Sequence, residues 1–122
     1  MILLSLHTGA RVGEIFSMTW GVVDFNNGSV LIRDAKGKPR HLYLTGATRK
    51  MLEGRYKTQR PTELVFKGRT GKQIVKVGKS FDRAVDDLKL NKGITDRRDR
   101  VTPHTCRHTF ASWHVQNGTD LY

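Results

Sequence analysis

The sequence predicts a mixed α+β fold, mainly helical, in which helices pack around a small antiparallel β-hairpin or sheet. Three observations lead to this prediction. Apolar residues recur at helical spacing in several separate stretches. Two short segments with alternating residues flank a glycine-containing turn, which is typical of a hairpin. The length of 122 residues accommodates one compact domain at most, so we expect residues 1–122 to form a single domain.

Two short helices are expected at the start of the chain, over residues 2–6 and 12–18. A glycine turn at Gly9-Ala10 separates them. A further apolar stretch then ends in the Asn-Asn-Gly turn at 26–28, which precedes the clearest strand pair of the sequence.

The hairpin is expected to pair residues 29–33 with residues 40–44 across a turn at 35–38. Leu42 and Leu44 alternate with polar or amphipathic neighbours, as in a half-buried strand. Because the turn contains lysines, the tip of the hairpin is basic.

Thr45 has the hydroxyl of an N-cap for a helix over residues 46–56. Residues 64–66 form a short apolar run and predict a buried strand or extended segment. The basic, glycine-rich residues 67–72 that follow predict a turn.

Two more helices are expected in the second half of the chain. Apolar residues from Phe81 to Leu88 predict a helix over 78–90, and the polar residues 91–100 predict an exposed loop. Thr102-Pro103 provides a hydroxyl cap followed by proline at the first position of the last helix, which Gly118 ends.

The chain carries a large excess of positive charge. It has 22 Lys and Arg against 11 Asp and Glu, a formal net charge of +11. Such an excess attracts polyanions, with nucleic acid the first candidate and an acidic membrane surface the second. No apolar run is long enough to cross a membrane. The single cysteine, Cys106, excludes an internal disulfide and a CxxC zinc site, so we expect the reducing cytoplasm.

The last helix carries a candidate anion site. His104, Arg107 and His108 are spaced three and four residues apart, so they can share one side of the helix. A histidine and a guanidinium in the first helical turn favour phosphate or another oxyanion. Phe110, Ala111 and Val115 are expected on the buried side. Taken alone, the segment is also explained by a cap histidine and a surface arginine.

A second candidate is the segment around Arg11, which a glycine turn delivers to the start of a helix. Glu14, three residues on, can pair with Arg11 or with a neighbouring base. A third candidate is Lys36 at the hairpin tip. When each segment is taken by itself, an ordinary capped helix and a solvated lysine are the simpler explanations.

Other chemistries find little support. His104 and His108 have the spacing of a zinc pair, but Thr105 stands where an HExxH site needs glutamate, so no metal is expected. Cys106 is two residues from His108, and side chains two apart on a helix diverge, which favours a structural thiol over a nucleophile. The glycines at 67–72 lack a Walker pattern, so no nucleotide is expected.

Three segments in this order resemble the catalytic domain of the tyrosine recombinases, also called phage-type integrases. Residues 3–20 are similar to the family's LLLxTGxRxGELxxLxW box, and residues 28–44 to its hairpin with a tip lysine. Residues 102–112 are similar to its TPHxLRHTxAS box. The resemblance covers nearly the whole chain and implies the recombinase catalytic-core fold.

The resemblance implies DNA strand breakage and rejoining through a 3′-phosphotyrosine, without cofactors. Arg11 and Arg107 would bind the scissile phosphate, and Lys36 would donate a proton to the departing 5′-oxygen. His104 would accept a proton or bind the phosphate near the attacking tyrosine. Glu14 and His108 would support the site without contacting the phosphate.

The tip lysine has two candidates. The turn is one residue shorter than in many hairpins of the family, and Asp34-Ala35-Lys36 aligns best if the missing residue follows Lys36. Lys38 is the second choice.

The resemblance implies no nucleophile in this chain. In the family an LGH/W box precedes the nucleophilic tyrosine, whereas Tyr122 follows a GxDL segment that lies before that box. We therefore expect a fragment of a larger integrase that binds double-stranded DNA without cleaving it. The family works as a tetramer on paired sites, so the full-length protein is expected to self-associate. A non-catalytic DNA-binding module is the alternative, and an RNA-binding protein is a third possibility.

Further basic residues are expected to contact the DNA backbone through phosphate, with binding that weakens as salt rises. They are Lys38, Arg40, Lys67, Arg69, Lys72, Lys76, Lys79, Arg97, Arg98 and Arg100.

Overall fold

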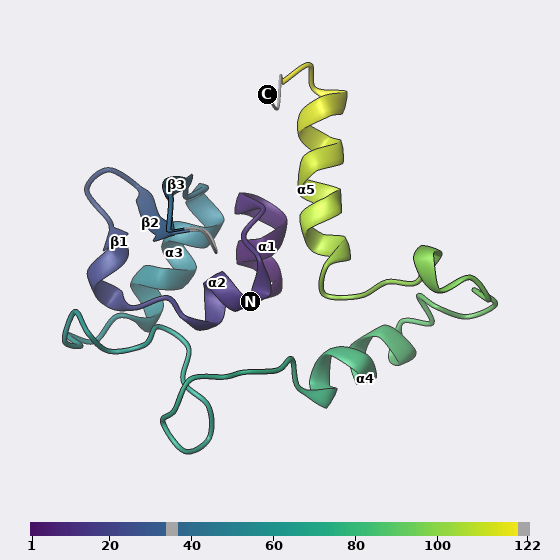
Figure 1. Ribbon diagram of the computed structural model, residues 1–122, viewed down its shortest axis with the longest axis horizontal. Coiled ribbons are helices and arrows are strands. Elements are labelled where there is room, and N and C mark those ends of the chain that lie inside the picture. Colours follow the sequence, from purple (N-terminus) through teal and green to yellow (C-terminus); the bar gives the residue numbers. More distant parts are fainter. Residues whose placement is uncertain (34–36, 120–122) are drawn as a thin grey trace.

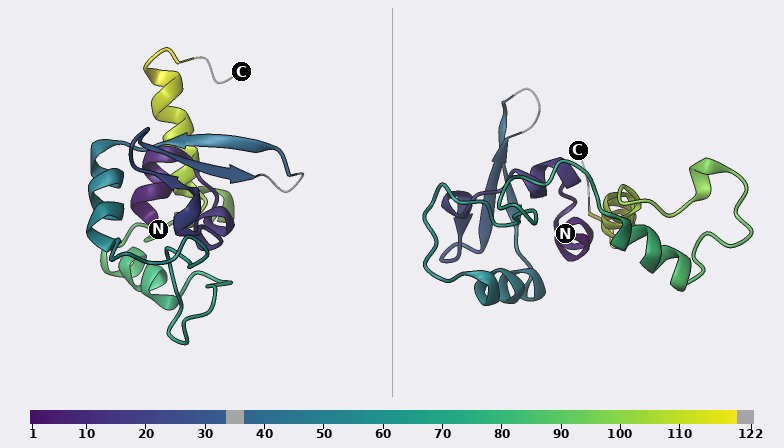
Figure 2. Two further views of the ribbon diagram at one scale, coloured as in Figure 1. Left: turned by 90° about the vertical axis from the view of Figure 1, so that its left-hand side faces the viewer. Right: turned by 90° about the horizontal axis from the view of Figure 1, so that it is seen from below.

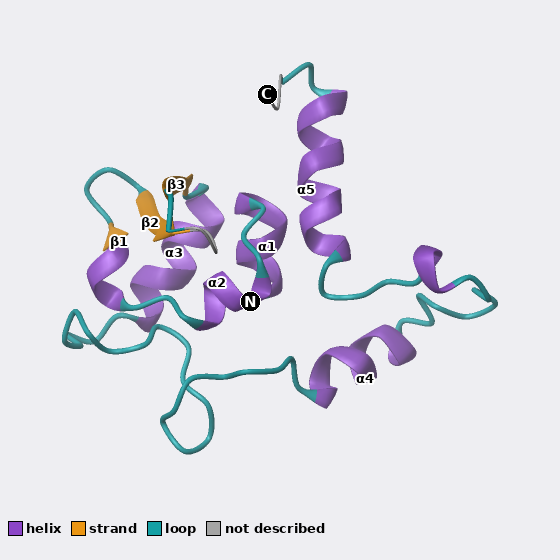
Figure 3. Ribbon diagram, viewed as in Figure 1, coloured by secondary structure: helices purple, strands orange, loops and turns teal. Residues whose placement is uncertain are grey.

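Helices dominate the architecture, and one small sheet lies among them (Figure 1, Figure 3). The structure is a computed structural model that describes residues 1–33 and 37–119. Within these ranges the chain forms five α-helices, two short 3-10 helices and a three-stranded antiparallel sheet. The predicted fold class is therefore confirmed.

Helices α1 (Ile2–Thr8) and α2 (Val12–Phe16) confirm the two helices predicted at the start of the chain. Gly9 ends α1 in the left-handed conformation, with φ 66° and its N–H donating to the Ser5 carbonyl. This conformation costs other residues more than glycine, which explains the sharp turn between the helices. Helix α2 is shorter than predicted because Ser17 caps it.

The sheet contains one strand that the sequence did not reveal. Strand β1 (Val23–Asp24) pairs with β2 (Ser29–Arg33), which pairs with β3 (Pro39–Tyr43), all antiparallel. The Asp24 carboxylate accepts the backbone N–H of Asn27 at 2.9 Å and stabilises the predicted turn. Strand β1 has only two residues, too few for an alternating pattern.

Helix α3 (Gly46–Arg55) confirms the predicted helix and its cap, because the Thr45 hydroxyl accepts the backbone N–H of Thr48 at 3.4 Å. Leu52 of α3 is fully buried in the main core. The core also contains apolar residues of α1, α2, the sheet and the segments that connect or follow them: Leu4, Ala10, Ile15, Phe16, Met18, Trp20, Val30, Ile32, Leu42, Val65 and Phe66. In the right-hand view of Figure 2, the β2–β3 hairpin projects from one side and α3 lies on the opposite side.

The segment after α3 is tied to the core by backbone hydrogen bonds. The short 3-10 helix η1 (Trp20–Val22) begins with the N–H of Trp20 donating to the Glu63 carbonyl at 2.9 Å. Val65 donates to the Met18 carbonyl at the same distance. The extended segment predicted at 64–66 thus holds a single isolated bridge, between Thr19 and Leu64, rather than a regular strand.

Helix α4 (Lys79–Asp87) is shorter than the predicted 78–90. Phe81 and Val85 of α4 are buried, whereas Leu88, which continues the same apolar spacing just after the helix, is 68% exposed. Lys89 adopts a positive φ of 54°, which ends the helical path before Leu90.

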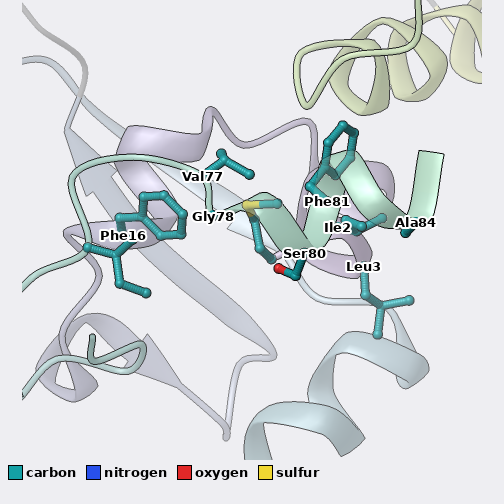
Figure 4. Close-up of a pocket in the computed structure, with 10 residues that line it drawn as sticks. Ile2, Leu3, Phe16, Val77, Gly78, Ser80, Phe81 and Ala84 are labelled. Atoms are coloured by element: carbon teal, nitrogen blue, oxygen red, sulfur yellow. The ribbon is translucent and has the colours of Figure 1, made fainter. Parts of the chain in front are cut away.

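Helix α4 borders an apolar groove of about 490 Å³ that also lies next to α1 and the end of α2 (Figure 4). The groove is lined mainly by apolar side chains, including those of Ile2, Phe16, Val77 and Phe81. Beyond α4, the polar segment 91–100 contains a short 3-10 helix, η2 (Arg97–Asp99), that Asp96 caps by accepting the N–H of Arg98.

Helix α5 (Thr105–Gln116) begins later than predicted. Thr102 and Pro103 lie before the helix, and the N-cap residue is His104, so the proposed hydroxyl cap was wrong. The Thr105 hydroxyl instead accepts the backbone N–H of Thr102 at 2.9 Å and closes the turn before the helix. Gly118, with φ 74°, follows the helix end as predicted.

Helix α5 lies beside α1, so the first and the last helix of the described chain are neighbours (Figure 1). Cys106 of α5 is buried, whereas Val115 is 60% exposed, which corrects its prediction as a buried residue. No helix in the described ranges is long and apolar enough to cross a membrane.

Gly9→Ala should destabilise the fold. A Cβ at this position would lie 2.6 Å from Cδ1 of Phe110 in α5, and the backbone has φ +66°. Both effects oppose alanine, so we expect the free energy of unfolding in urea to fall by about 2–4 kcal/mol. Gly13→Ala is the matched control, because a Cβ there meets nothing within 4 Å. Gly13 is inside α2, where alanine should add about 0.5–1 kcal/mol. Equal effects of the two substitutions would contradict this account.

Candidate functional site

Arg107 connects the last helix to the first. Its Nη1 donates a hydrogen bond of 2.8 Å to the carbonyl of Gly9, across 98 residues of sequence. Because Gly9 ends α1 two residues before Arg11, this contact brings the two predicted phosphate-binding arginines into one region. The bond uses one guanidinium nitrogen, and the side chain has further N–H groups for a ligand.

Arg11 and Glu14 form the other half of the site. Arg11 is the N-cap residue of α2, and its backbone N–H donates to Glu14 Oε2 at 2.7 Å. Its Nη1 also contacts Glu14 Oε1, at 3.4 Å. The predicted pairing of Glu14 with Arg11 is present. The Arg11 side chain is 53% exposed and the Glu14 side chain only 11%, so the cation lies toward solvent.

Arg40 also contacts Glu14, although the sequence indicated only that Arg40 would contact the DNA backbone. Its Nη2 donates to Glu14 Oε2 at 2.8 Å. In the β2–β3 ladder Arg40 pairs with Ile32, which is buried, so the two share a face of the sheet. The alternation that placed Leu42 inward also places Arg40 on that face. This was the sequence signal that could have found it.

We call Arg11, Arg40, Arg107 and Glu14 the arginine cluster. Arg11 and Arg40 contact the Glu14 carboxylate, and the charge of Arg107 is close enough to interact with these groups, so positive charge is in excess. Burial lowers the pKa of Arg107, and the positive charges of Arg11 and Arg40 lower it further, while Glu14 opposes the effect. A bound anion would relieve this repulsion, because it adds negative charge among like charges.

The two histidines flank Arg107 on α5. The His104 carbonyl accepts the backbone N–H of Arg107 at 3.1 Å and that of His108 at 3.3 Å. The imidazole of His104 meets that of His108 edge to face, with ring centroids 4.7 Å apart. Both residues are exposed. The structure therefore places His104 one helical turn from Arg107, and its ring contact is with its own helix rather than with α2.

Two predicted residues of interest fall beyond what the structure describes. Lys36, the first choice for the tip lysine, lies outside the described residues, as does Tyr122. Lys38, the second choice, is exposed just before β3. Arg40, two residues after Lys38 on β3, contacts Glu14 in the arginine cluster.

The remaining basic candidates are exposed but spread out. Those of 67–79 lie on the loop before α4 and its first residue, and those of 97–100 lie on and after η2, well apart in Figure 1. Lys67 forms an ion pair with Glu63, and Arg98 forms one with Asp96 at 2.7 Å. The sequence did not reveal these acidic partners, which reduce the charge that either cation offers to an anion.

Metal binding and the reactivity of Cys106 depend on the geometry of the side chains. In the ranges that the structure covers, no group of three His, Cys, Asp or Glu residues is arranged to hold a metal ion. Cys106 is a free buried thiol, and burial raises its pKa. A thiol that resists ionisation is a poor nucleophile, which agrees with a structural role.

In this α+β domain an arginine of the last helix lies beside the start of the second helix. This is the architecture of an integrase catalytic domain. Comparison with family models agrees over the full length. The chain belongs to the phage integrase family, whose model matches residues 1–122.

Its curated relatives include tyrosine recombinases named XerC. The XerC of Lactobacillus leichmannii is 29% identical, with the match covering 99% of this chain and 42% of that protein. The XerC of Lacticaseibacillus casei is 32% identical, covering 93% of this chain and 40% of that protein. The chain thus spans less than half the length of these relatives.

Solved structures share the fold. The Tn1549 transposon integrase in complex with circular intermediate DNA superposes with a TM-score of 0.75 at 20% identity, over 98% of this chain and 47% of that one. The XerA recombinase gives 0.65 at 27% identity, over 95% and 43%. The described helices and sheet are therefore those of tyrosine recombinase catalytic domains.

Cys106 should react slowly while the protein is folded. Because burial raises its pKa, less thiolate is present than for a free thiol with a pKa of about 8.5. We expect alkylation by iodoacetamide at pH 8, followed by mass spectrometry, to be at least about tenfold slower in buffer than in denaturing guanidinium chloride. The contribution of the buried, protonated thiol to the free energy of unfolding is retained below the pKa of the unfolded thiol and is lost as the pH rises above that pKa. Similar rates in both states would contradict a buried thiol.

Proposed function

We propose that this chain is part of the catalytic domain of a site-specific DNA recombinase, which binds duplex DNA and prepares one phosphodiester for strand exchange. The observation that supports the proposal most is the arginine cluster. In a member of the phage integrase family, Arg107 reaches Gly9 next to the Arg11–Glu14 pair. Local helix capping alone does not require Arg107 to cross to the first helix.

Arg11 and Arg107 have side chains that suit a phosphodiester. A guanidinium can donate two parallel hydrogen bonds to phosphate oxygens. Arg11 and Arg107 would bind the non-bridging oxygens and stabilise the negative charge that grows in the pentacoordinate transition state. Arg107 is partly buried, which strengthens its contacts because less water competes for them.

The proposed reaction is transfer of the phosphoryl group to a tyrosine. The tyrosine oxygen attacks phosphorus and loses its proton, the bond to the 5′-oxygen breaks, and that oxygen takes up a proton. His104 would accept the first proton or bind the phosphate, and Lys36 would supply the second, with Lys38 as the alternative donor. Reversal of these steps rejoins the strand.

We further propose that the nucleophile is none of the tyrosines in this chain. Tyr43 lies on β3 and is 74% exposed, and Tyr56 packs against Trp20 with ring centroids 5.1 Å apart. Tyr122 belongs to the GxDL segment that precedes the nucleophile box in the family. The chain would then bind DNA and polarise the phosphate without forming a covalent bond to it.

The partners follow from the same proposal. A relative, the XerH recombinase, has been solved bound to its difH substrate. By analogy this chain would bind double-stranded DNA in the cytoplasm and, within its full-length protein, assemble as a tetramer on paired sites. The exposed basic residues at 38, 67–79 and 97–100 would contact the DNA backbone. Glu14 and His108 would support the site without contacting the phosphate.

Binding to duplex DNA should depend strongly on salt. Each phosphate contact that is lost reduces the slope of log K against log salt by about 0.9. We expect Arg11→Ala to weaken binding about tenfold, because it removes a charge-assisted contact. Arg83→Ala removes the same charge from the exposed surface of α4 and should change affinity by less than about threefold. Fluorescence anisotropy at several salt concentrations measures both, and equal losses would contradict a specific role for Arg11.

A suicide DNA substrate, nicked so that the cleaved strand cannot rejoin, should give no covalent adduct with this chain. The expected band on a denaturing gel is free DNA, while the full-length XerC of Lactobacillus leichmannii on its own site serves as the positive control. An adduct mapped to Tyr122 by mass spectrometry would contradict the assignment of the nucleophile to another segment.

A further inference from the structure

The Glu14 carboxylate is shared by two arginines that come from different elements. Arg11 begins α2, and Arg40 belongs to β3 in the hairpin. Glu14 Oε2 accepts the backbone N–H of Arg11 at 2.7 Å and Nη2 of Arg40 at 2.8 Å. One carboxylate therefore fixes the start of the helix and the position of the strand.

The two guanidinium groups do not share the carboxylate equally. The contact of Arg40 has the length of a strong charge-assisted hydrogen bond. The contact between Arg11 Nη1 and Glu14 Oε1 is longer, at 3.4 Å. Arg40 is therefore the main counter-charge of Glu14. Arg11 binds the same carboxylate more closely through its backbone N–H than through its guanidinium.

Burial explains why this division matters. The Glu14 side chain is 11% exposed, and a carboxylate removed from water to this extent needs a nearby positive charge. The Arg40 side chain is 35% exposed and that of Arg11 is 53% exposed. The counter-charge is thus provided from the more buried side, and the more exposed guanidinium lies toward solvent.

We propose that Arg40 is a positioning residue that neutralises Glu14 and thereby leaves the Arg11 guanidinium available to an oxyanion. Without Arg40, the Glu14 carboxylate would draw Arg11 into a tight ion pair, and the anion would have to compete with it. The inference rests on the proposed function for its ligand, a phosphate group.

Arg40 has a second effect at Arg107. Besides burial, its positive charge, like that of Arg11, lowers the pKa of Arg107. Loss of Arg40 would therefore weaken the positive field at both phosphate-binding arginines. Arg33 on β2 is the matched comparison because it belongs to the same hairpin and is exposed, and its printed hydrogen bond goes to the Gly37 carbonyl, at 3.4 Å, rather than to Glu14.

The test is a titration of the 122-residue chain with inorganic phosphate. The arginine Nε–Hε signals in NMR spectra report the binding. Arg40→Gln should weaken phosphate binding about tenfold, the effect of losing one charge-assisted interaction. Arg33→Gln removes the same charge from the same hairpin and should weaken it by less than about threefold. Equal losses for the two variants would overturn the inference.

The decisive measurement is suppression by a second substitution. Glu14→Gln removes the negative charge but keeps an oxygen that accepts the backbone N–H of Arg11. Alone it should bind phosphate at least as tightly as the unsubstituted chain. Combined with Arg40→Gln, it should restore affinity, because no carboxylate remains to draw Arg11 inward. A purely structural role for Arg40 predicts no such rescue, so a double variant as weak as Arg40→Gln would overturn the inference.

Arg40→Lys guards against a folding defect in Arg40→Gln. Lysine keeps the counter-charge and can make the single hydrogen bond that Nη2 makes, so affinity should stay within about threefold of the original. An amide spectrum checks the fold of every variant. Phosphate binding that does not depend on position 40 overturns the inference, as does an absence of phosphate binding.

A parallel titration with a DNA duplex separates the two proposals. If the unsubstituted chain binds phosphate in the manner described but does not bind the duplex, the proposed function fails and the role of Arg40 stands. If it binds the duplex and Arg40→Gln matches Arg33→Gln in phosphate binding, the role of Arg40 fails and the proposed function stands.

Discussion

The hydrogen bond from Arg107 to the Gly9 carbonyl is the contact on which the arrangement of the site depends. It requires a carbonyl that α1 leaves available at its end, a left-handed residue that turns the chain toward Arg11, and a helix α5 that lies beside α1. Phe110 of α5 occupies the space that a Cβ of Gly9 would need. The absence of a side chain at Gly9 therefore allows both the turn and the close approach of the two helices.

Charge compensation is the second constraint, and Glu14 is central to it. One poorly exposed carboxylate receives a backbone N–H and contacts two guanidinium groups, so positive charge exceeds negative charge around it. This excess is local, unlike the rest of the +11 net charge, which lies largely on exposed side chains of the loops and helices. A small domain can thus combine a local cluster of positive charge with a wider basic surface that attracts a polyanion.

Local sequence signals predicted the elements well where their causes are local. The Thr45 cap, the turn at Gly9 and the glycine after α5 are decided by residues within a few positions of each other. Prediction failed where longer-range contacts or very short elements decide the outcome. Strand β1 is too short to show a period and exists because β2 pairs with it. Leu88 has the spacing of a buried residue, but the described chain provides no core to cover it.

The sequence by itself determined the residue types, their order and the local caps, and from these the resemblance to the integrases that the family match confirms. Tertiary structure alone decided that Arg107 bonds to Gly9, across 98 residues, and that Arg40 compensates Glu14, across 26. The physical reason is that capping and turns depend on neighbouring backbone groups, whereas these two contacts depend on how α5 packs beside α1 and on which face of the hairpin meets α2. The site is therefore a product of packing among residues that the sequence had already provided.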